Sequence, residues 1–195
     1  MKKIIFLSIF IVLAIIISCG DEILESPEPE EDNWIDLPDN PALGDTTKFD
    51  VSSKIVGSDG GTIEFNKEFI GGPYGQYCIS AKLRVLSGTF ACSDTIDFTL
   101  SVDAKNASVL VSPVDSNFTR PLKLTLTYCG IDLSGVNVSE MDFVYGNGFD
   151  TFIDVYYDDA VVDTLTGKLE VTNAHIEYIP NPIPLAKYGW VRKAD

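Results

Sequence analysis

The sequence predicts an all-β protein whose main domain, residues 48–195, is an antiparallel β-sandwich. From Lys48 onward, short runs rich in Val, Ile, Thr, Phe and Tyr are divided by Gly, Asn, Asp and Pro. Apolar and polar residues alternate clearly in the runs 96–102 and 122–128, which indicates strands with one face in the core and one in solvent. No long stretch repeats its apolar positions with a helical period.

The expected strands follow one another with turns between them. Phe49 opens the first strand, and the glycine-rich run 57–61 supplies the positive-φ positions of a turn into the second, at 62–65. Further strands are expected at 78–86, 95–102, 108–114, 122–128, 141–145, 151–157, 168–172 and 188–192. Asp158 and Asp159 are expected to form a hairpin turn. A domain of this length buries roughly two-thirds of its unfolded surface, so it can fold without a disulfide.

The N-terminus has the pattern of a bacterial lipoprotein signal. Two lysines precede an apolar run, residues 4–17, which is about as long as a signal-peptide core and too short to cross a bilayer comfortably. A small residue and Cys19 follow, as in the lipobox, where a peptidase cuts before a lipid-modified cysteine. We therefore expect a signal peptide at 1–18 and lipidation of Cys19. The alternative is an uncleaved anchor helix that ends at Cys19.

Residues 19–47 are expected to form a tether between the lipid and the domain. The segment contains many acidic residues, several prolines and no lysine or arginine. Charge repulsion and proline therefore prevent it from forming a hydrophobic core of its own. Trp34 and Ile35 are its large apolar pair, and we expect them to dock on the domain. The expected location is the cell outer membrane, with a lipid anchor and a domain that faces the periplasm or the cell surface.

The charge of the chain limits the classes of partner. The formal net charge is −15, and loss of residues 1–18, which hold two lysines and no acids, brings it to −17 (−15 − 2). Such a surface repels phosphate backbones and anionic headgroups, so we expect no nucleic-acid partner. The expected partners are the membrane, through the N-terminal lipid, and an envelope protein or a glycan.

Three cysteines remain when Cys19 is lipidated: Cys78, Cys92 and Cys129. In an oxidising compartment one pair can close and one thiol stays free, and Cys78 and Cys92 are the nearest pair in sequence. The alternative is that all three are small buried hydrophobic residues on strands. His175 is the only histidine, so neither a zinc site nor a Cys-His nucleophile pair is well supported.

The order of the motifs resembles a known domain family. The motifs are Gly60 to Ile63, 79–86, Ser87 to Phe90, 95–102, 118–128, Gly130 to Leu133, 167–172 and Lys187 to Trp190. Over residues 55–192 they resemble the β-sandwich domain shared by zonula-occludens proteins, netrin receptors and ankyrins. The resemblance implies an antiparallel sandwich that serves protein contacts and has no active site. The histidine of the family's closing element has no counterpart here, because Pro184 to Tyr188 stand in its place and His175 lies earlier.

Aromatic and acidic residues mark a candidate ligand surface, which consists of Tyr145, Phe152, Asp154, Tyr156 and Asp158. The aromatic rings would stack against sugars, and the alternative is ordinary core and cross-strand packing. If strand pairing is regular, Asp154 and Asp158 share a strand face. Carboxylates suit calcium, but the alternation and glycine turn of an EF-hand loop are absent, so we interpret the acids as turn and surface residues and expect no metal.

No catalytic residues are predicted, because no nucleophile-elbow pattern marks a serine and His175 stands alone. We therefore expect no enzyme and no cofactor. The expected function is a protein-interaction or scaffolding module of the cell envelope, tethered through Cys19. The alternative function is a carbohydrate-binding surface lipoprotein associated with polysaccharide uptake.

Overall fold

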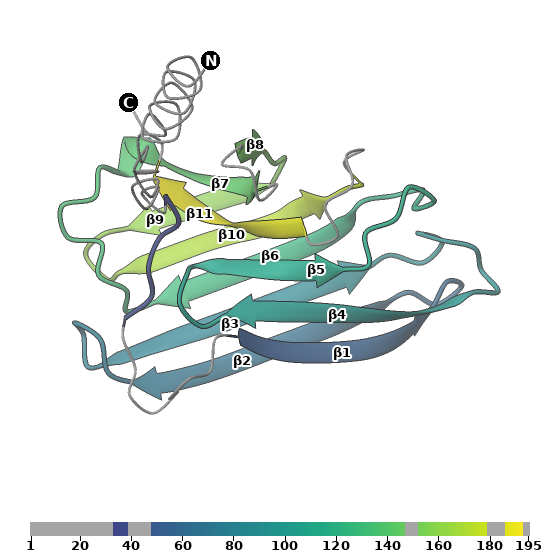
Figure 1. The fold of residues 1–195 in the computed structure, drawn as a ribbon, viewed down its shortest axis with the longest axis horizontal. Helices are drawn as coiled ribbons and strands as arrows, with labels where there is room; N and C mark the ends of the chain where they lie inside the picture. Colours follow the sequence, from purple (N-terminus) through teal and green to yellow (C-terminus); the bar gives the residue numbers. More distant parts are fainter. Residues whose placement is uncertain (1–32, 39–47, 147–151, 179–185, 193–195) are drawn as a thin grey trace, which may run out of the picture. The chain divides into compact units, whose positions relative to one another are not determined.

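The structure is a computed structural model that describes residues 33–38, 48–146, 152–178 and 186–192. Within these residues the chain forms two antiparallel sheets that lie one over the other (Figure 1), which confirms the predicted all-β class. The signal peptide, Cys19 and most of the predicted tether lie outside the described residues. None of the helices in the described part is long and apolar enough to cross a membrane.

Eleven strands can be followed in the described residues. They are β1 (Lys48–Val56), β2 (Gly61–Ile70), β3 (Gln76–Val85), β4 (Thr95–Asp103), β5 (Ser108–Ser112), β6 (Leu122–Cys129), β7 (Met141–Gly146), β8 (Phe152–Asp154), β9 (Asp159–Asp163), β10 (Lys168–Ile176) and β11 (Ala186–Arg192). One sheet has the order β1-β4-β5-β11-β7-β8, and the other has the order β2-β3-β6-β10-β9. The ten expected strands each correspond to one of these, and β9 was not expected.

The core lies between the two sheets and follows the alternation seen in the sequence. Along β6, buried and half-buried residues alternate through the whole strand, so Leu124 and Leu126 point into the core. Phe98 and Leu100 of β4 enter the same apolar cluster from the other sheet, together with Trp190 of β11. The outer face of the five-stranded sheet is left to polar side chains, and the candidate site forms there.

The segment 33–38 packs against the sandwich. The amide of Ile35 donates to the carbonyl of Trp190 at 3.0 Å, and its side chain is 1% exposed. Trp34 forms a bridge with Val191 and packs edge-on against Phe152, with ring centroids 5.4 Å apart. The predicted docking of Trp34 and Ile35 is confirmed, and the Ile35 side chain belongs to the core.

The predicted hairpin at Asp158 and Asp159 is wrong. β8 ends at Asp154 and pairs with β7 in the six-stranded sheet, whereas β9 begins at Asp159 and pairs with β10 in the other sheet. Residues 155–158 therefore cross from one sheet to the other, so Asp154 and Asp158 do not share a strand face. The amide of Asp158 donates to the carbonyl of Thr172 on β10 at 3.0 Å, which fastens the end of this crossing.

The expected pairing of Cys78 with Cys92 is also wrong. Cys78 lies opposite Cys129 in the register of β3 and β6, and the two form a disulfide. Cys92 is a free, exposed cysteine. Sequence proximity misled the prediction because residues on neighbouring strands are closer in space than residues on a connecting loop.

Candidate functional site

A β-bulge in β10 decides which side chains reach the outer face of the five-stranded sheet. Val171 pairs with Leu126 and Ala174 pairs with Leu124, so β10 carries one extra residue between these two pairs. Asn173 lies in this bulge with φ at 52°, a left-handed conformation that asparagine tolerates better than most residues. Side chains alternate with a period of two, so the extra residue reverses the faces that follow it. His175 consequently points outward.

The bulge brings His175 to Lys123 of β6. The two residues are opposite in the register, and Nζ of Lys123 is in hydrogen-bond contact with Nε2 of His175. A lysine ammonium can only donate, so Nε2 accepts and the ring proton lies on Nδ1. That nitrogen lies 3.6 Å from Oε1 of Glu177, which leaves Lys123, His175 and Glu177 in one chain of polar contacts.

Tyr156 stands against the imidazole of His175. The two ring centroids are 4.5 Å apart and the rings meet edge to face, at 65°. The backbone amide of His175 donates to the carbonyl of Tyr156 at 2.8 Å, so the crossing segment is fastened to β10 at this residue too. Despite these contacts, Tyr156 is 67% exposed. A largely exposed aromatic ring is therefore held in a fixed position.

A pocket of about 320 Å³ opens beside this ring, between β8, the crossing segment and the end of β10. We call it the Tyr156 pocket. Its charged and polar walls come from Asp154, Tyr156, His175 and Glu177, and its apolar walls come from Ile153 and Val155. Aromatic, acidic and imidazole groups thus face one small cavity.

Tyr188 of β11 also lines the Tyr156 pocket, from the buried side. Its hydroxyl donates to the carbonyl of Glu177 at 3.4 Å. Burial raises the pKa of the Tyr188 phenol well above its ordinary value, and the nearby Tyr145 and Glu177 raise it further. The phenol therefore stays neutral and gives the pocket a fixed hydroxyl.

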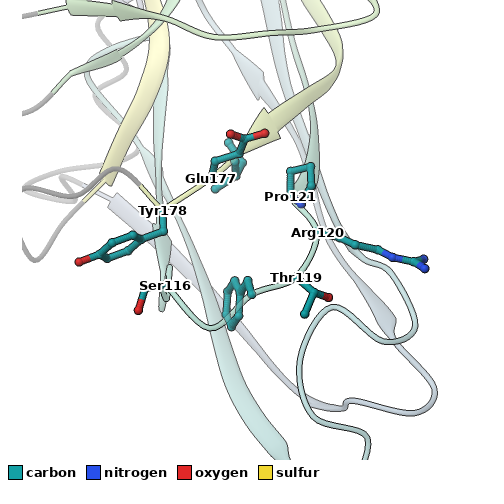
Figure 2. A pocket seen from close by; sticks show the side chains of 8 residues that line it. Ser116, Thr119, Arg120, Pro121, Glu177 and Tyr178 are labelled. Atoms are coloured by element: carbon teal, nitrogen blue, oxygen red, sulfur yellow. The ribbon is translucent and has the colours of Figure 1, made fainter.

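A second pocket, also about 320 Å³, lies between the loop 116–121 and the residues Ile176 to Tyr178 (Figure 2). Figure 2 shows that the Arg120 side chain is directed away from this cavity, and that the Tyr178 ring points outward on the opposite side. Its exposed ring, Tyr178, and its arginine are therefore not directed into the cavity. We therefore treat the Tyr156 pocket as the candidate site.

Of the five residues of the predicted ligand surface, two lie in the Tyr156 pocket. Asp154 and Tyr156 meet in the Tyr156 pocket, whereas Tyr145 is buried with its ring centroid 5.2 Å from that of Tyr188. Phe152 packs on Trp34, as described above. The Asp158 carboxylate accepts a hydrogen bond from the side-chain Nδ2 of Asn173 at 2.9 Å, so it supports the bulge and does not line the pocket.

The sequence prediction missed three residues of the site: Lys123, His175 and Glu177. Only one signal in the sequence points to them, which is Asn173 inside an otherwise apolar-polar alternating strand. Asparagine is depleted in strands, and its presence there is consistent with a bulge. Among the described residues, no group of three or more His, Cys, Asp and Glu side chains is placed to hold a metal ion.

The described fold is thus a two-sheet antiparallel protein with a small pocket at the crossing between the sheets. Comparison with known proteins finds no family model, no curated protein and no solved structure that matches this chain. The geometry of the site and the pattern of the N-terminus are therefore the features that indicate its function.

Proposed function

We propose that this chain is a lipoprotein of the cell outer membrane, anchored through Cys19, whose sandwich is a non-catalytic module that binds a saccharide. The main support for saccharide binding is the Tyr156 residue, which is 67% exposed, packs against His175, and lines a pocket with two carboxylates. The motif order that resembles the sandwich of zonula-occludens proteins, netrin receptors and ankyrins supports a binding role.

The chemistry of the pocket suits a sugar ring. A sugar presents an apolar face of C–H groups, which packs on an exposed aromatic ring, and hydroxyls, which need acceptors and donors. Asp154 and Glu177 supply acceptors, and Tyr156 and Tyr188 supply hydroxyls. A volume of about 320 Å³ is at the small end of ligand sites, so the pocket suits one sugar unit of a longer chain.

Replacement of the tyrosine tests this proposal. Tyr156→Ala should weaken polysaccharide binding roughly tenfold, because an aromatic contact contributes about 0.5–1.5 kcal/mol and the lost apolar area adds to this. Tyr74→Ala is the matched control, since Tyr74 is an exposed tyrosine on a distant turn and should leave binding unchanged. The measurement is isothermal titration against a panel of polysaccharides. Absence of binding to every member at millimolar concentration would contradict the proposal.

The anchor is tested separately. The basic start, the apolar run 4–17 and Cys19 support lipidation, and two or more acyl chains hold a protein durably at a membrane. Cys19→Ser should therefore move the protein from the membrane fraction to the soluble fraction and remove the lipid mass from the mature chain. A Cys19→Ser variant that stays wholly with the membranes would contradict the anchoring proposal and leave the saccharide proposal intact.

A protein-interaction or scaffolding role is the second candidate, and one surface feature favours it. Ile70, the last residue of β2, is 88% exposed, and Leu165 on the β9–β10 turn is 86% exposed. The Tyr74 hydroxyl donates to the carbonyl of Thr164 at 3.4 Å, so the β2–β3 and β9–β10 turns lie side by side. If this apolar tip binds an envelope protein, Ile70→Ser with Leu165→Ser should abolish co-purification of that protein from detergent-solubilised membranes, whereas Tyr156→Ala should not.

A further inference from the structure

We propose that the saccharide carries an acidic group, a carboxylate or a sulfate, and that a row of cations on the outer face of the five-stranded sheet binds it. Its charged members are Arg84 on β3 and Lys123 on β6, and His175 on β10, which accepts a hydrogen bond from Lys123, ends the row. This inference rests on the proposed saccharide function and specifies the chemistry of its ligand.

The strand register aligns the three residues. Arg84 pairs with Lys123, and Lys123 pairs with His175, so the row runs straight across three neighbouring strands. All three point outward, because the residues that flank them on each strand are buried in the core. Neighbouring strands are about 4.8 Å apart, so the row extends roughly 10 Å from β3 to β10.

Ordinary charge pairing does not explain this row. Lys82 and Glu64, one step along the same face, pair across β2 and β3 at 2.7 Å. Arg84, by contrast, makes no ion pair within the described residues, and the hydrogen-bond partner of Lys123 is an imidazole and not a carboxylate. Like charges placed opposite each other on neighbouring strands are destabilising. The chain has a formal net charge of −15, yet it places Arg84 and Lys123 opposite each other. A bound anion would offset the repulsion between these two side chains.

The row is continuous with the Tyr156 pocket. His175 ends the row and contacts the Tyr156 ring, so a sugar stacked on Tyr156 would extend its substituents toward Lys123 and Arg84. The planar guanidinium of Arg84 can bind a carboxylate or a sulfate through two parallel hydrogen bonds.

The carboxylates Asp154 and Glu177 lie on the pocket side of His175 and repel a second acid there. The ligand is therefore oriented with a neutral ring in the pocket and its acidic group over the row. The net negative charge of the protein disfavours a free anion, but charges more than about 8 Å away are largely screened at physiological salt. An anion held close by a sugar on Tyr156 interacts mainly with the row.

The test compares three classes of oligosaccharide of matched chain length, namely uronate-bearing, sulfated and neutral, by isothermal titration at physiological salt and above. At least one acidic class should bind roughly tenfold or more tightly than the neutral class, with an affinity that falls as salt is raised. Arg84→Gln and Lys123→Gln should each remove most of that preference, because a hydrogen bond to a charged group is among the stronger polar contacts. Lys54→Gln, the same charge change on β1 of the other sheet, should retain it.

Each outcome separates this inference from the function on which it rests. A preference for uronates or for sulfates identifies the acidic group. Equal binding of acidic and neutral sugars that still depends on Tyr156 would contradict the proposal that the row binds an acidic group. It would leave the saccharide proposal intact. Acidic preference that survives both glutamine variants would also overturn it. Absence of binding to all three classes would overturn both proposals, and thermal unfolding of each variant shows that it remains folded.

Discussion

Cys78 of β3 and Cys129 of β6 lie directly opposite each other, with Cα atoms 5.0 Å apart, and are joined by a disulfide. The bond closes a loop with a sequence separation of 51, for which the loss of chain entropy in the unfolded state predicts a stabilisation of about 4 kcal/mol. The Cys78→Ser, Cys129→Ser double variant should lose about that amount in urea unfolding. Thiol labelling of the oxidised native protein should modify Cys92 and leave Cys78 unmodified.

Ile35 tests whether the segment 33–38 is part of the folded unit. Its side chain is 1% exposed in the core, so Ile35→Ala should lower the free energy of unfolding by about 2–5 kcal/mol. Asp36→Ala changes the adjacent exposed residue and should cost less than about 1 kcal/mol. Equal effects of the two variants on chemical unfolding would show that Ile35 does not pack as described.

The buried phenol of Tyr128 should lower the free energy of unfolding at alkaline pH. Burial, and secondly the charge of Asp103, raise the pKa of its phenol well above the ordinary value, and its hydroxyl donates to the carbonyl of Ser108 at 3.1 Å. Above pH ~10 the unfolded chain releases this proton while the folded chain retains it, so stability falls as the pH rises.

The expected slope for one such tyrosine is about 1.4 kcal/mol per pH unit above pH ~10, with no contribution below it. Tyr128→Phe should be less stable at neutral pH, because it loses the hydrogen bond, but should show a shallower decline between pH 10 and 12. Tyr178→Phe, which removes an exposed phenol, is the control. Identical declines for wild type and Tyr128→Phe would contradict the assignment.

Alternation predicts most of the fold, because most of the strands have one buried face, as β3 and β6 do. The expected strand at 122–128 and the observed β6, Leu122–Cys129, differ by one residue at the end. β9 was missed because its residues are half-buried or exposed at a sheet edge and carry an aspartate at each end. Alternation also does not reveal which sheet a strand joins, so the sequence predicts a hairpin where the chain crosses from β8 to β9.

The site was predictable only in part. Asp154 and Tyr156 were identified because they belong to a cluster of aromatic and acidic residues in the sequence. His175 was not, because counting by twos from Leu169 and Val171 places it in the core. The single extra residue at Asn173 reverses that assignment, and its effect depends on the partner strand β6. The same limit applies to the disulfide, whose partners are neighbours only through the register of β3 and β6.

The central claim is that the Tyr156 pocket is the ligand site of this protein. The most direct test is backbone chemical-shift mapping by NMR during titration with the tightest-binding saccharide of the panel. We predict that the largest shifts cluster at residues 153–156 and 174–177, around the pocket. Shifts confined to the apolar tip around Ile70 and Leu165, or shifts that Tyr156→Ala leaves unchanged, would contradict the account.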